Sequence, residues 1–345
     1  MRILLGLSGG VDSTYAALAL KNEGHEVEAA VLKMHEYTSI DEAAESAASL
    51  GIPLHVVDCT AVFKEKVMSD LVNEYTRGRT PNPCVICNSE VKFKFLHDYA
   101  KKNGFDKIAT GHYASVVELS DADGSFYAIK RGADAKKDQT YMLWRLPQYI
   151  LKDLVFPLAE CDKSFVREKT REGGLVAAER ADSQEICFLP NGDYASFVES
   201  VAGPSKKGDF IDESGKRLGV HNGIIRYTVG QRRGLGISAS SRLFVTSIDP
   251  VSNTVTLSLN DAYAKSVKIG GMVYSGIRPK KSVEELRLLV KLRYAAPAVP
   301  CSAMLDGDSA VLILDEPQRA VTPGQSAVLY DGDVIVAGGF IDSAN

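Results

Sequence analysis

The chain has 345 residues, of which 45% are hydrophobic and 24% charged, and this composition is typical of a soluble globular protein with two or three domains. Its net charge of −4 at pH 7 excludes a uniformly basic nucleic-acid binder, although Lys and Arg still cluster locally. No apolar run approaches the roughly 20 residues that span a bilayer, and Asp12 interrupts the apolar start, so we expect a cytoplasmic protein with neither a signal peptide nor a membrane segment.

The first half of the chain alternates short apolar runs with helical patterns. Ser39 and Glu42 form a capping box that predicts the start of one helix, which ends near Gly51. Repeated units of this kind predict an α/β fold with a doubly wound parallel sheet. The predicted strands cover residues 3–7, 27–32, 54–57 and 107–110, and the predicted helices cover residues 13–22, 39–50, 61–75 and 88–102.

Beyond residue 190 the helical periodicity fades, and short alternating runs separated by turns take its place. Their spacing predicts small antiparallel β-barrels. These runs cover residues 242–248, 254–257, 286–292, 310–314, 327–330 and 334–340. We therefore expect an α/β domain at residues 1–190, a small and mostly β central domain at residues 191–265, and a C-terminal antiparallel β-barrel at residues 266–345.

A glycine-rich loop joins the first predicted strand to the first predicted helix. It reads Ser8-Gly9-Gly10-Val11-Asp12-Ser13. Its glycines let the backbone approach a ligand closely, and exposed N–H groups at a helix N-terminus favour an anion. The Walker and dinucleotide-binding patterns are both absent. Local physics leaves a plain glycine turn, capped by Asp12 or Ser13, as an equal alternative.

Two of the six cysteines, Cys84 and Cys87, lie in a loop stiffened by two prolines. Six cysteines are too few for a disulfide scaffold in a chain of this length. We expect Cys87 at the start of the following helix, where the helix dipole lowers the pKa of a thiol. Such a thiolate would carry sulfur or bind a metal. Half of a zinc site is the rival interpretation, but a second Cys-x-x-Cys pair is missing.

Several stretches, taken together, resemble the bacterial tRNA-specific 2-thiouridylases, a family of PP-loop ATP pyrophosphatases with a HUP-like fold. The resemblance covers nearly the whole chain and implies ATP-dependent adenylation of the C2 oxygen of the wobble uridine, position 34 of tRNA, followed by sulfur transfer to give 2-thiouridine. The matching stretches are the glycine-rich loop, two cysteine motifs at residues 80–88 and 181–188, and the segments 109–114, 137–141, 227–236 and 317–325.

The resemblance also assigns roles to individual residues. It implies that Cys87 is the catalytic nucleophile and that Cys187 carries the sulfur as a persulfide. The nucleotide site is expected at Gly6, Leu7, Ser8, Gly9, Gly10, Val11, Asp12, Ser13, Leu32 and Gly111. The tRNA contacts are expected at Asn82, Pro83, Cys84, His112, Lys137, Asp138, Gln139, Arg293, Tyr294 and Gln325.

Two sulfur routes compete. In the first, Cys187 carries a persulfide and Cys87 completes the transfer, which ends in a Cys87–Cys187 disulfide. In the second, Cys84, Cys87 and Cys187 hold a [4Fe-4S] cluster whose open iron binds hydrosulfide. Cys84 stands where the family usually has Asp, which raises the second route, but the first route needs only the two family cysteines and is preferred. Other departures are Leu32 for a common Met, a short loop at residues 33–39, and Ala181 for a frequent Lys.

The resemblance further implies cofactors and partners. ATP and Mg²⁺ are expected, together with tRNAs for Lys, Glu and Gln and a sulfur donor, either a cysteine desulfurase or a persulfide relay protein. We expect a monomer. Two other functions stay open: a PP-loop synthetase that adenylates a small molecule, and a non-catalytic tRNA-binding module. The first would not need the three cysteines, and the second would not need the glycine-rich loop.

Overall fold

Five parallel strands form the sheet of the first domain, in the order β3-β2-β1-β4-β7. The computed structural model describes residues 1–180, 186–189, 192–238, 241–280 and 282–345. Every neighbouring pair in this sheet is parallel, which confirms the predicted α/β fold. The strands are β1 (Arg2–Gly6), β2 (Glu26–Lys33), β3 (Leu54–Asp58), β4 (Lys107–Thr110) and β7 (Leu154–Val155).

Helices cover both faces of this sheet. Alternate residues of a buried strand point to opposite faces, so each face has apolar side chains that must pack against a helix. In β1, Ile3 and Leu5 join one core cluster, whereas Leu4 joins another. The predicted helix at residues 39–50 is confirmed: Ser39 accepts a hydrogen bond from the Glu42 N–H at 3.4 Å. The helical segments are α1 (Val11–Asn22), α2 (Ile40–Leu50), α3 (Thr60–Phe63), η1 (Lys64–Met68), α4 (Ser69–Thr76), α5 (Pro83–Ile86), η2 (Cys87–Lys92), α6 (Phe93–Lys102), η3 (Thr140–Met142), α7 (Gln148–Leu151), α8 (Lys163–Glu172) and η4 (Val176–Glu179).

Two of the predicted helices contain π-helical turns. The helix predicted at residues 61–75 consists of α3, η1 and α4, and the one predicted at residues 88–102 starts five residues earlier, at Pro83. A π-helical turn bonds residue i to residue i+5 and is often found at functional sites. Within the described residues, no helix is both long enough and apolar enough to span a membrane.

The central domain combines one helix with a four-stranded sheet in the order β10-β11-β8-β9. Helix α9 (Tyr194–Ala202) corrects the expectation that helical character ends near residue 190. It is only nine residues long, so its helical pattern of apolar residues, which buries Ala195 and Val198, spans little more than two turns. The remaining elements are β8 (Gly208–Ile211), β9 (Arg217–His221), η5 (Ile224–Arg226), β10 (Phe244–Asp249) and β11 (Thr254–Ser258).

Six antiparallel strands close into the predicted C-terminal barrel, in the order β12-β15-β14-β13-β16-β17, with β17 pairing back onto β12. A hairpin from the first domain, β5 (Ser115–Asp121) and β6 (Gly124–Lys130), extends the same sheet through a single pairing of Val334 with Lys130. The barrel strands are β12 (Tyr263–Tyr274), β13 (Glu284–Lys291), β14 (Val299–Asp306), β15 (Ser309–Arg319), β16 (Ser326–Asp331) and β17 (Val334–Ala344).

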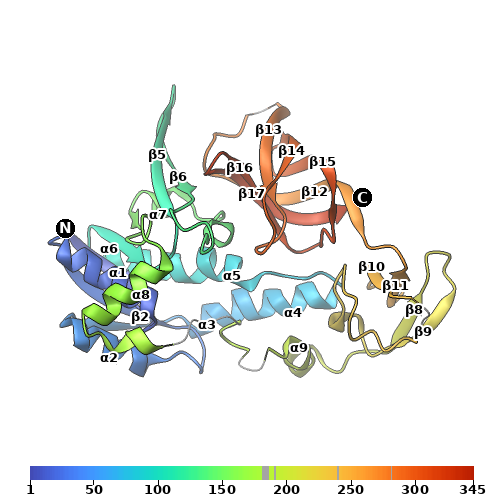
Figure 1. Ribbon diagram of the computed structural model, residues 1–345, viewed down its shortest axis with the longest axis horizontal. Helices are drawn as coiled ribbons and strands as arrows, with labels where there is room; N and C mark the ends of the chain where they lie inside the picture. The colour runs from blue at the N-terminus through green and yellow to red at the C-terminus, as the bar shows by residue number, and fades with distance from the viewer. Residues whose placement is uncertain (181–185, 190–191, 239–240, 281) are drawn as a thin grey trace.

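The barrel is packed directly against the first domain (Figure 1). Ser326 receives hydrogen bonds from two buried aromatic side chains of that domain: the Trp144 indole N–H at 3.0 Å and the Tyr141 hydroxyl, to the Ser326 carbonyl, at 2.9 Å. A Cβ at Gly338 would lie 2.6 Å from Trp144, so only glycine allows this approach. These contacts fix the barrel beside the loop that carries Cys84 and Cys87.

Candidate active site

The candidate nucleotide site lies at the carboxyl ends of three adjacent strands. Gly6, the last residue of β1, pairs with Ala30 of β2 and with Thr110 of β4. Leu32 and Gly111 follow these partners along their strands, so both residues lie beside the glycine-rich loop. Ligands of open α/β sheets bind in this crevice. The structure therefore brings together the residues that the sequence assigned to the nucleotide.

The glycine-rich loop is held by its own hydroxyl groups. The Ser8 N–H donates to Ser13 Oγ at 3.2 Å, and Ser13 Oγ donates to the Gly10 carbonyl at 3.1 Å. Gly10 is the N-cap of α1 and has no side chain to satisfy the first N–H groups of that helix. These N–H groups and the helix dipole form a binding site for an anion such as a phosphate.

Two glycines of this site are required by close backbone approaches. Gly9 has φ +85°, and a Cβ there would lie 2.6 Å from the backbone carbon of Glu42. A Cβ at Gly111 would lie 2.7 Å from the Ser13 nitrogen. At Gly10, by contrast, the nearest atom would be 3.6 Å away. A side chain at Gly10 is therefore compatible with the fold, although it would occupy the space of a ligand.

The Asp12 carboxylate interacts with two side chains that the sequence did not reveal as its partners. Its Oδ1 accepts a hydrogen bond from the Tyr113 hydroxyl at 2.7 Å and forms an ion pair with Lys163 Nζ at 2.6 Å. Lys163 is the first residue of α8 and is 151 residues away in the chain. It places a cation at the phosphate loop. No local motif could have indicated it, because the contact exists only in the folded chain.

The loop that carries Cys84 and Cys87 leads directly into helix α5. Asn82 caps α5 by accepting a hydrogen bond from the Cys84 N–H at 3.2 Å, and Pro83 occupies the first helical position. Cys84 is exposed, and Cys87 lies a turn later with 5% exposure. Burial raises the pKa of Cys87 to about 12. The predicted lowering of this pKa by a helix N-terminus is therefore wrong, because the helix begins four residues before Cys87.

Cys87 nevertheless lies at the same edge of the sheet as the phosphate loop. Its Sγ contacts Met34 Sδ at 3.7 Å, and Met34 directly follows β2. The π-helical segment η2 starts at Cys87 and ends at Lys92. The i to i+5 turn of a π-helix brings these two residues to neighbouring positions on the helix surface.

Lys92 connects all three cysteines of the predicted site. Its ammonium interacts electrostatically with Cys87, Cys84 and Cys187, and it lowers the pKa of both Cys87 and Cys187 against the larger effect of burial. Burial is the largest influence on Lys92 itself and lowers its pKa, but the three sulfurs together raise it. No local motif of the sequence singles out Lys92 for this role.

Cys187 is solvent-exposed as a residue, yet neighbouring protein atoms still desolvate its thiol and raise its pKa. The next residue, Phe188, anchors it by packing edge-on against Phe63, with ring centroids 5.3 Å apart. The first part of the second cysteine motif, residues 181–185, lies outside the described residues. Cys84, Cys87 and Cys187 are all free thiols in this structure.

His112 lies between the two parts of the site. Its ring faces Phe93 and Phe156 at centroid distances of 5.5 and 6.1 Å, and its Nδ1 is 2.8 Å from the Thr110 hydroxyl. Burial, followed by the charge of Lys92, lowers its pKa to about 3. The imidazole is therefore neutral at physiological pH and offers a hydrogen bond rather than a charge.

Two residues of the predicted tRNA motif at 137–139 are engaged within the protein. Asp138 is buried, accepts hydrogen bonds from the N–H and hydroxyl of Thr140 at 2.9 and 2.6 Å, and lies 3.7 Å from Lys291 of the barrel. Gln139 accepts the Tyr113 N–H at 2.9 Å. Both side chains thus hold the motif in place, which leaves the half-buried Lys137 as its charged member.

Arg293 and Gln325 bond to neighbouring domains. The Arg293 guanidinium donates to the Val229 carbonyl of the central domain at 3.3 Å and to the Ala320 carbonyl of the barrel. Gln325 donates to the Thr80 carbonyl at 2.8 Å, next to the loop that carries the cysteines. Both residues therefore join domains, whatever contacts they make with RNA.

Tyr294 is an exposed aromatic member of the predicted tRNA set, at 41% exposure. Burial of its hydroxyl raises its pKa, and that hydroxyl also interacts electrostatically with Lys137 and Cys84. The barrel, the 137–139 motif and the cysteine loop therefore meet around Tyr294. An exposed aromatic ring beside a lysine is suited to an unpaired base and its phosphate.

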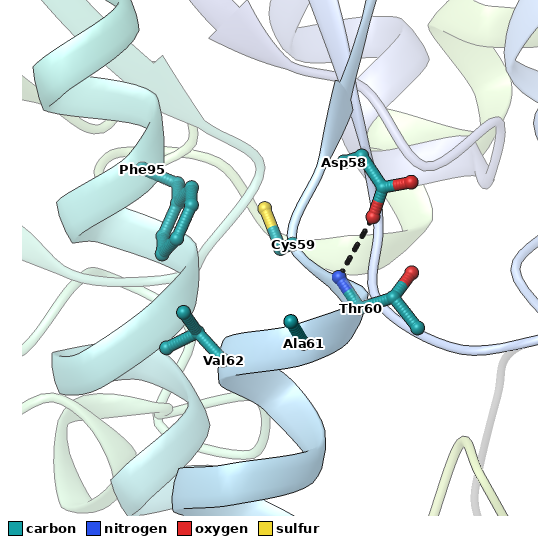
Figure 2. A pocket seen from close by; sticks show the side chains of 6 residues that line it. All are labelled: Asp58, Cys59, Thr60, Ala61, Val62 and Phe95. Atoms are coloured by element: carbon teal, nitrogen blue, oxygen red, sulfur yellow. Dashed lines mark hydrogen bonds between the residues drawn. The ribbon is translucent and has the colours of Figure 1, made fainter.

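A separate cavity of about 520 Å³ opens at the carboxyl end of β3 (Figure 2). It is flanked by Cys59, whose pKa is raised to about 12 by burial, and by Phe95 of α6. Asp58 at its rim accepts the Thr60 N–H at 2.9 Å. None of the residues predicted for the site lines this cavity.

Three family models together match nearly the whole chain. The model described as the tRNA methyl transferase HUP domain matches residues 1–191, and the tRNA methyl transferase PRC-barrel domain matches residues 195–259. The aminomethyltransferase beta-barrel domain matches residues 266–341.

Full-length relatives carry one name, tRNA-specific 2-thiouridylase MnmA. The protein of Clostridioides difficile is 38% identical over 358 residues, which cover 99% of this chain and 98% of that protein. The protein of Acetivibrio thermocellus is 39% identical over 358 residues, with 99% of each chain covered. That of Geotalea uraniireducens is 40% identical over 363 residues, covering 99% of this chain and 95% of its own.

Solved structures show more distant likenesses. A 4-thiouridine synthetase–RNA complex with bound ATP is 18% identical, with a TM-score of 0.39, and the match covers 58% of this chain and 50% of that one. An NMN synthetase from Francisella tularensis is 16% identical, with a TM-score of 0.34, covering 58% of this chain and 76% of that one. Likenesses at these TM-scores support no conclusion about function.

Proposed function

The chain belongs to the family of tRNA-specific 2-thiouridylases, and on that premise we propose that it uses ATP to replace the C2 oxygen of the wobble uridine of tRNA, position 34, with sulfur. The observation that carries the proposal is that one edge of the sheet presents both a phosphate loop and the Cys87 thiol. The loop follows β1, and the Cys87 thiol contacts Met34, which follows the neighbouring strand β2.

The chemistry divides between these two parts. The uridine O2 attacks the α-phosphorus of ATP, pyrophosphate leaves, and the poor leaving oxygen becomes part of an adenylate. The terminal sulfur of a persulfide on Cys187 then attacks C2, and AMP departs with the oxygen. Cys87 attacks the Cys187 sulfur, which releases 2-thiouridine and leaves a Cys87–Cys187 disulfide for an external thiol to reduce. A base in the anticodon must leave its stack to reach this site.

The residues at the phosphate loop support the first step. The loop N–H groups and Lys163 offer positive charge to the phosphates, and the Asp12 carboxylate is the oxygen ligand at the loop that would hold Mg²⁺. Bound Mg²⁺ would neutralise charge on the departing pyrophosphate. His112, kept neutral by its surroundings, would donate or accept a hydrogen bond at the base.

The arrangement of the thiols favours the persulfide route. Among the described residues, no group of three or more His, Cys, Asp or Glu side chains is placed to hold a metal ion, and the persulfide route needs only Cys87 and Cys187. The Lys92 ammonium interacts electrostatically with the thiols of Cys84, Cys87 and Cys187. A positive charge in this position stabilises an anionic sulfur.

ATP–pyrophosphate exchange tests the function. Exchange that requires tRNA is the expected result, because the nucleophile is a base of the RNA. Exchange without tRNA would point to a synthetase for a small molecule, and tRNA binding without exchange would point to a non-catalytic module.

Cys84→Ser tests the sulfur route. Under the persulfide route Cys84 only lines the pocket, so the variant keeps most of the wild-type activity when thiolation is assayed anaerobically with a persulfide donor. Cys161→Ser, outside the site, is the control. A wild type whose activity follows its iron content, combined with an inactive and iron-free Cys84→Ser, would replace this route with the cluster route.

Partners follow from the same proposal. The exposed Tyr294 and the neighbouring Lys137 would contact the anticodon loop of tRNAs for Lys, Glu and Gln. A cysteine desulfurase or a persulfide relay protein would deliver sulfur to Cys187, which is exposed enough to be reached. We propose that the protein acts as a monomer in the cytoplasm, where its substrates are.

A further inference from the structure

Arg180 binds the phosphate loop from outside the loop's own sequence. Its Nη1 donates to the Gly9 carbonyl at 2.5 Å and to the Glu42 carbonyl at 3.0 Å, and its Nη2 pairs with Glu45 at 2.5 Å. The side chain is only 19% exposed. Four residues of α2 and the loop are thus held by one guanidinium, because Ser46 Oγ also accepts from Nη1 at 3.1 Å.

The bond to Gly9 fixes the direction of a phosphate-binding group. The Gly9 carbonyl and the Gly10 N–H belong to one planar trans peptide unit and point in opposite directions. A guanidinium that holds the carbonyl therefore also sets the direction of the N–H. Within the part of the chain that the structure describes, that N–H makes one long contact, 3.4 Å, to Ser8 Oγ, a contact that a phosphate oxygen would readily replace.

Arg180 also begins the segment that leads to the sulfur-carrying cysteine. Cys187 is seven residues further along the chain. Beyond it, Phe188 is fixed by Phe63 and by Phe197, at centroid distances of 5.3 and 5.6 Å. Arg180 thus contacts the phosphate loop, and Phe188, next to Cys187, packs against Phe63, while residues 181–185 lie outside the described part of the chain.

We propose that Arg180 is a positioning residue that directs the Gly10 N–H toward the pyrophosphate group of ATP and couples occupancy of the phosphate loop to the segment bearing Cys187. The inference rests on the proposed function, which supplies ATP as the ligand and sulfur as the cargo of Cys187. Arg180 contacts the phosphate loop and lies seven residues before Cys187, so a ligand on the loop is expected to change the reactivity of that cysteine.

The experiment compares wild type, Arg180→Ala and Arg180→Lys without tRNA. It measures ATP affinity by equilibrium binding and the rate at which iodoacetamide alkylates Cys187, with and without saturating ATP, by peptide mass. In wild type, ATP slows alkylation at least threefold. In Arg180→Ala, ATP affinity falls about tenfold, as expected for loss of a charged hydrogen-bond donor, and ATP no longer affects Cys187. Arg180→Lys recovers part of the affinity.

Arg171→Ala is the matched control, since it removes an arginine of α8 that is exposed and pairs with the exposed Glu179. It leaves both measurements unchanged. If Arg180→Ala binds ATP with wild-type affinity, or if ATP still slows the alkylation of its Cys187 as in wild type, the inference fails while the proposed function stands. A wild type that binds no ATP overturns the proposed function and the inference together. If Arg180→Ala does not fold, Arg180→Lys decides by showing a reduced or an unchanged ATP effect.

Discussion

At the scale of single residues, the ammonium of Lys92 interacts with the thiols of Cys84, Cys87 and Cys187. Sulfur transfer requires sulfur anions, because the thiolate rather than the thiol is the nucleophile. Burial opposes that charge and raises the pKa of Cys87 to about 12. Lys92 is therefore the group that makes an anionic sulfur tolerable in this pocket.

We expect Lys92→Gln to lower the ratio of alkylation rates at Cys187 by iodoacetate and by iodoacetamide, by about fivefold. The same thiolate attacks both reagents and displaces iodide, so the ratio of the two rates reports the local charge rather than the extent of ionisation. Lys92→Arg keeps the ratio, and Lys94→Gln, an exposed lysine on α6, is the control. A Lys92→Gln ratio equal to that of wild type would show that this charge does not act on the sulfur.

At the scale of elements, the phosphate loop predicts opposite outcomes for two adjacent glycines. Gly9→Ala forces a side chain into φ +85° and within 2.6 Å of Glu42, so it lowers the thermal midpoint by an amount equivalent to about 2 kcal/mol. Gly10→Val meets no such contact, so it melts like wild type but loses ATP binding. Thermal melts and equilibrium ATP binding check both. Normal ATP binding by Gly10→Val would contradict the loop assignment.

Sequence could predict those elements whose signals are local. Buried parallel strands read as apolar runs, and Ser39 and Gly51 mark a helix by their own chemistry. The hairpin β5–β6 and the strands β12 and β14 were missed. The two strands of the hairpin are neighbours in the chain but are largely exposed, and β12 pairs with β15 and β17, which are distant in the chain. The raised pKa of Cys87 was missed for the same reason: its burial depends on packing that no neighbouring residue reveals.

The site shows the same division. The glycine-rich loop and both cysteine motifs were predicted from short stretches. Lys163, Tyr113 and Arg180 were not, since they reach the loop from 101 or more residues away. Sequence also cannot show that Asp138 is buried against Lys291. Each of these facts is a tertiary contact.

At the scale of the whole molecule, Arg293 connects the barrel to the central domain, and this changes the effect expected when its side chain is removed. Arg293→Ala breaks bonds to Val229 and Ala320 and is expected to lower the thermal midpoint and the tRNA affinity without altering the salt dependence of binding. Lys137→Ala is expected to reduce the slope of log affinity against log salt by about 1, as for one lost phosphate contact.

Lys136→Ala, at an exposed neighbouring lysine, controls for loss of charge alone. Melting curves and tRNA binding at a series of salt concentrations distinguish the cases. A flatter salt dependence in Arg293→Ala, with an unchanged melt, would return Arg293 to the phosphate-binding role expected from the sequence.

The close packing of Gly338 against Trp144 also has a consequence for the protein during its synthesis. Translation proceeds from the N-terminus at about 5–20 residues per second, so roughly 10–40 s separate the synthesis of these two partners. During that interval a nascent chain already has its phosphate loop but lacks the barrel that borders the cysteine loop. Only a finished chain can assemble the whole RNA-facing surface, so an unfinished one left by a stalled ribosome could hold a nucleotide and yet have no complete site for a tRNA.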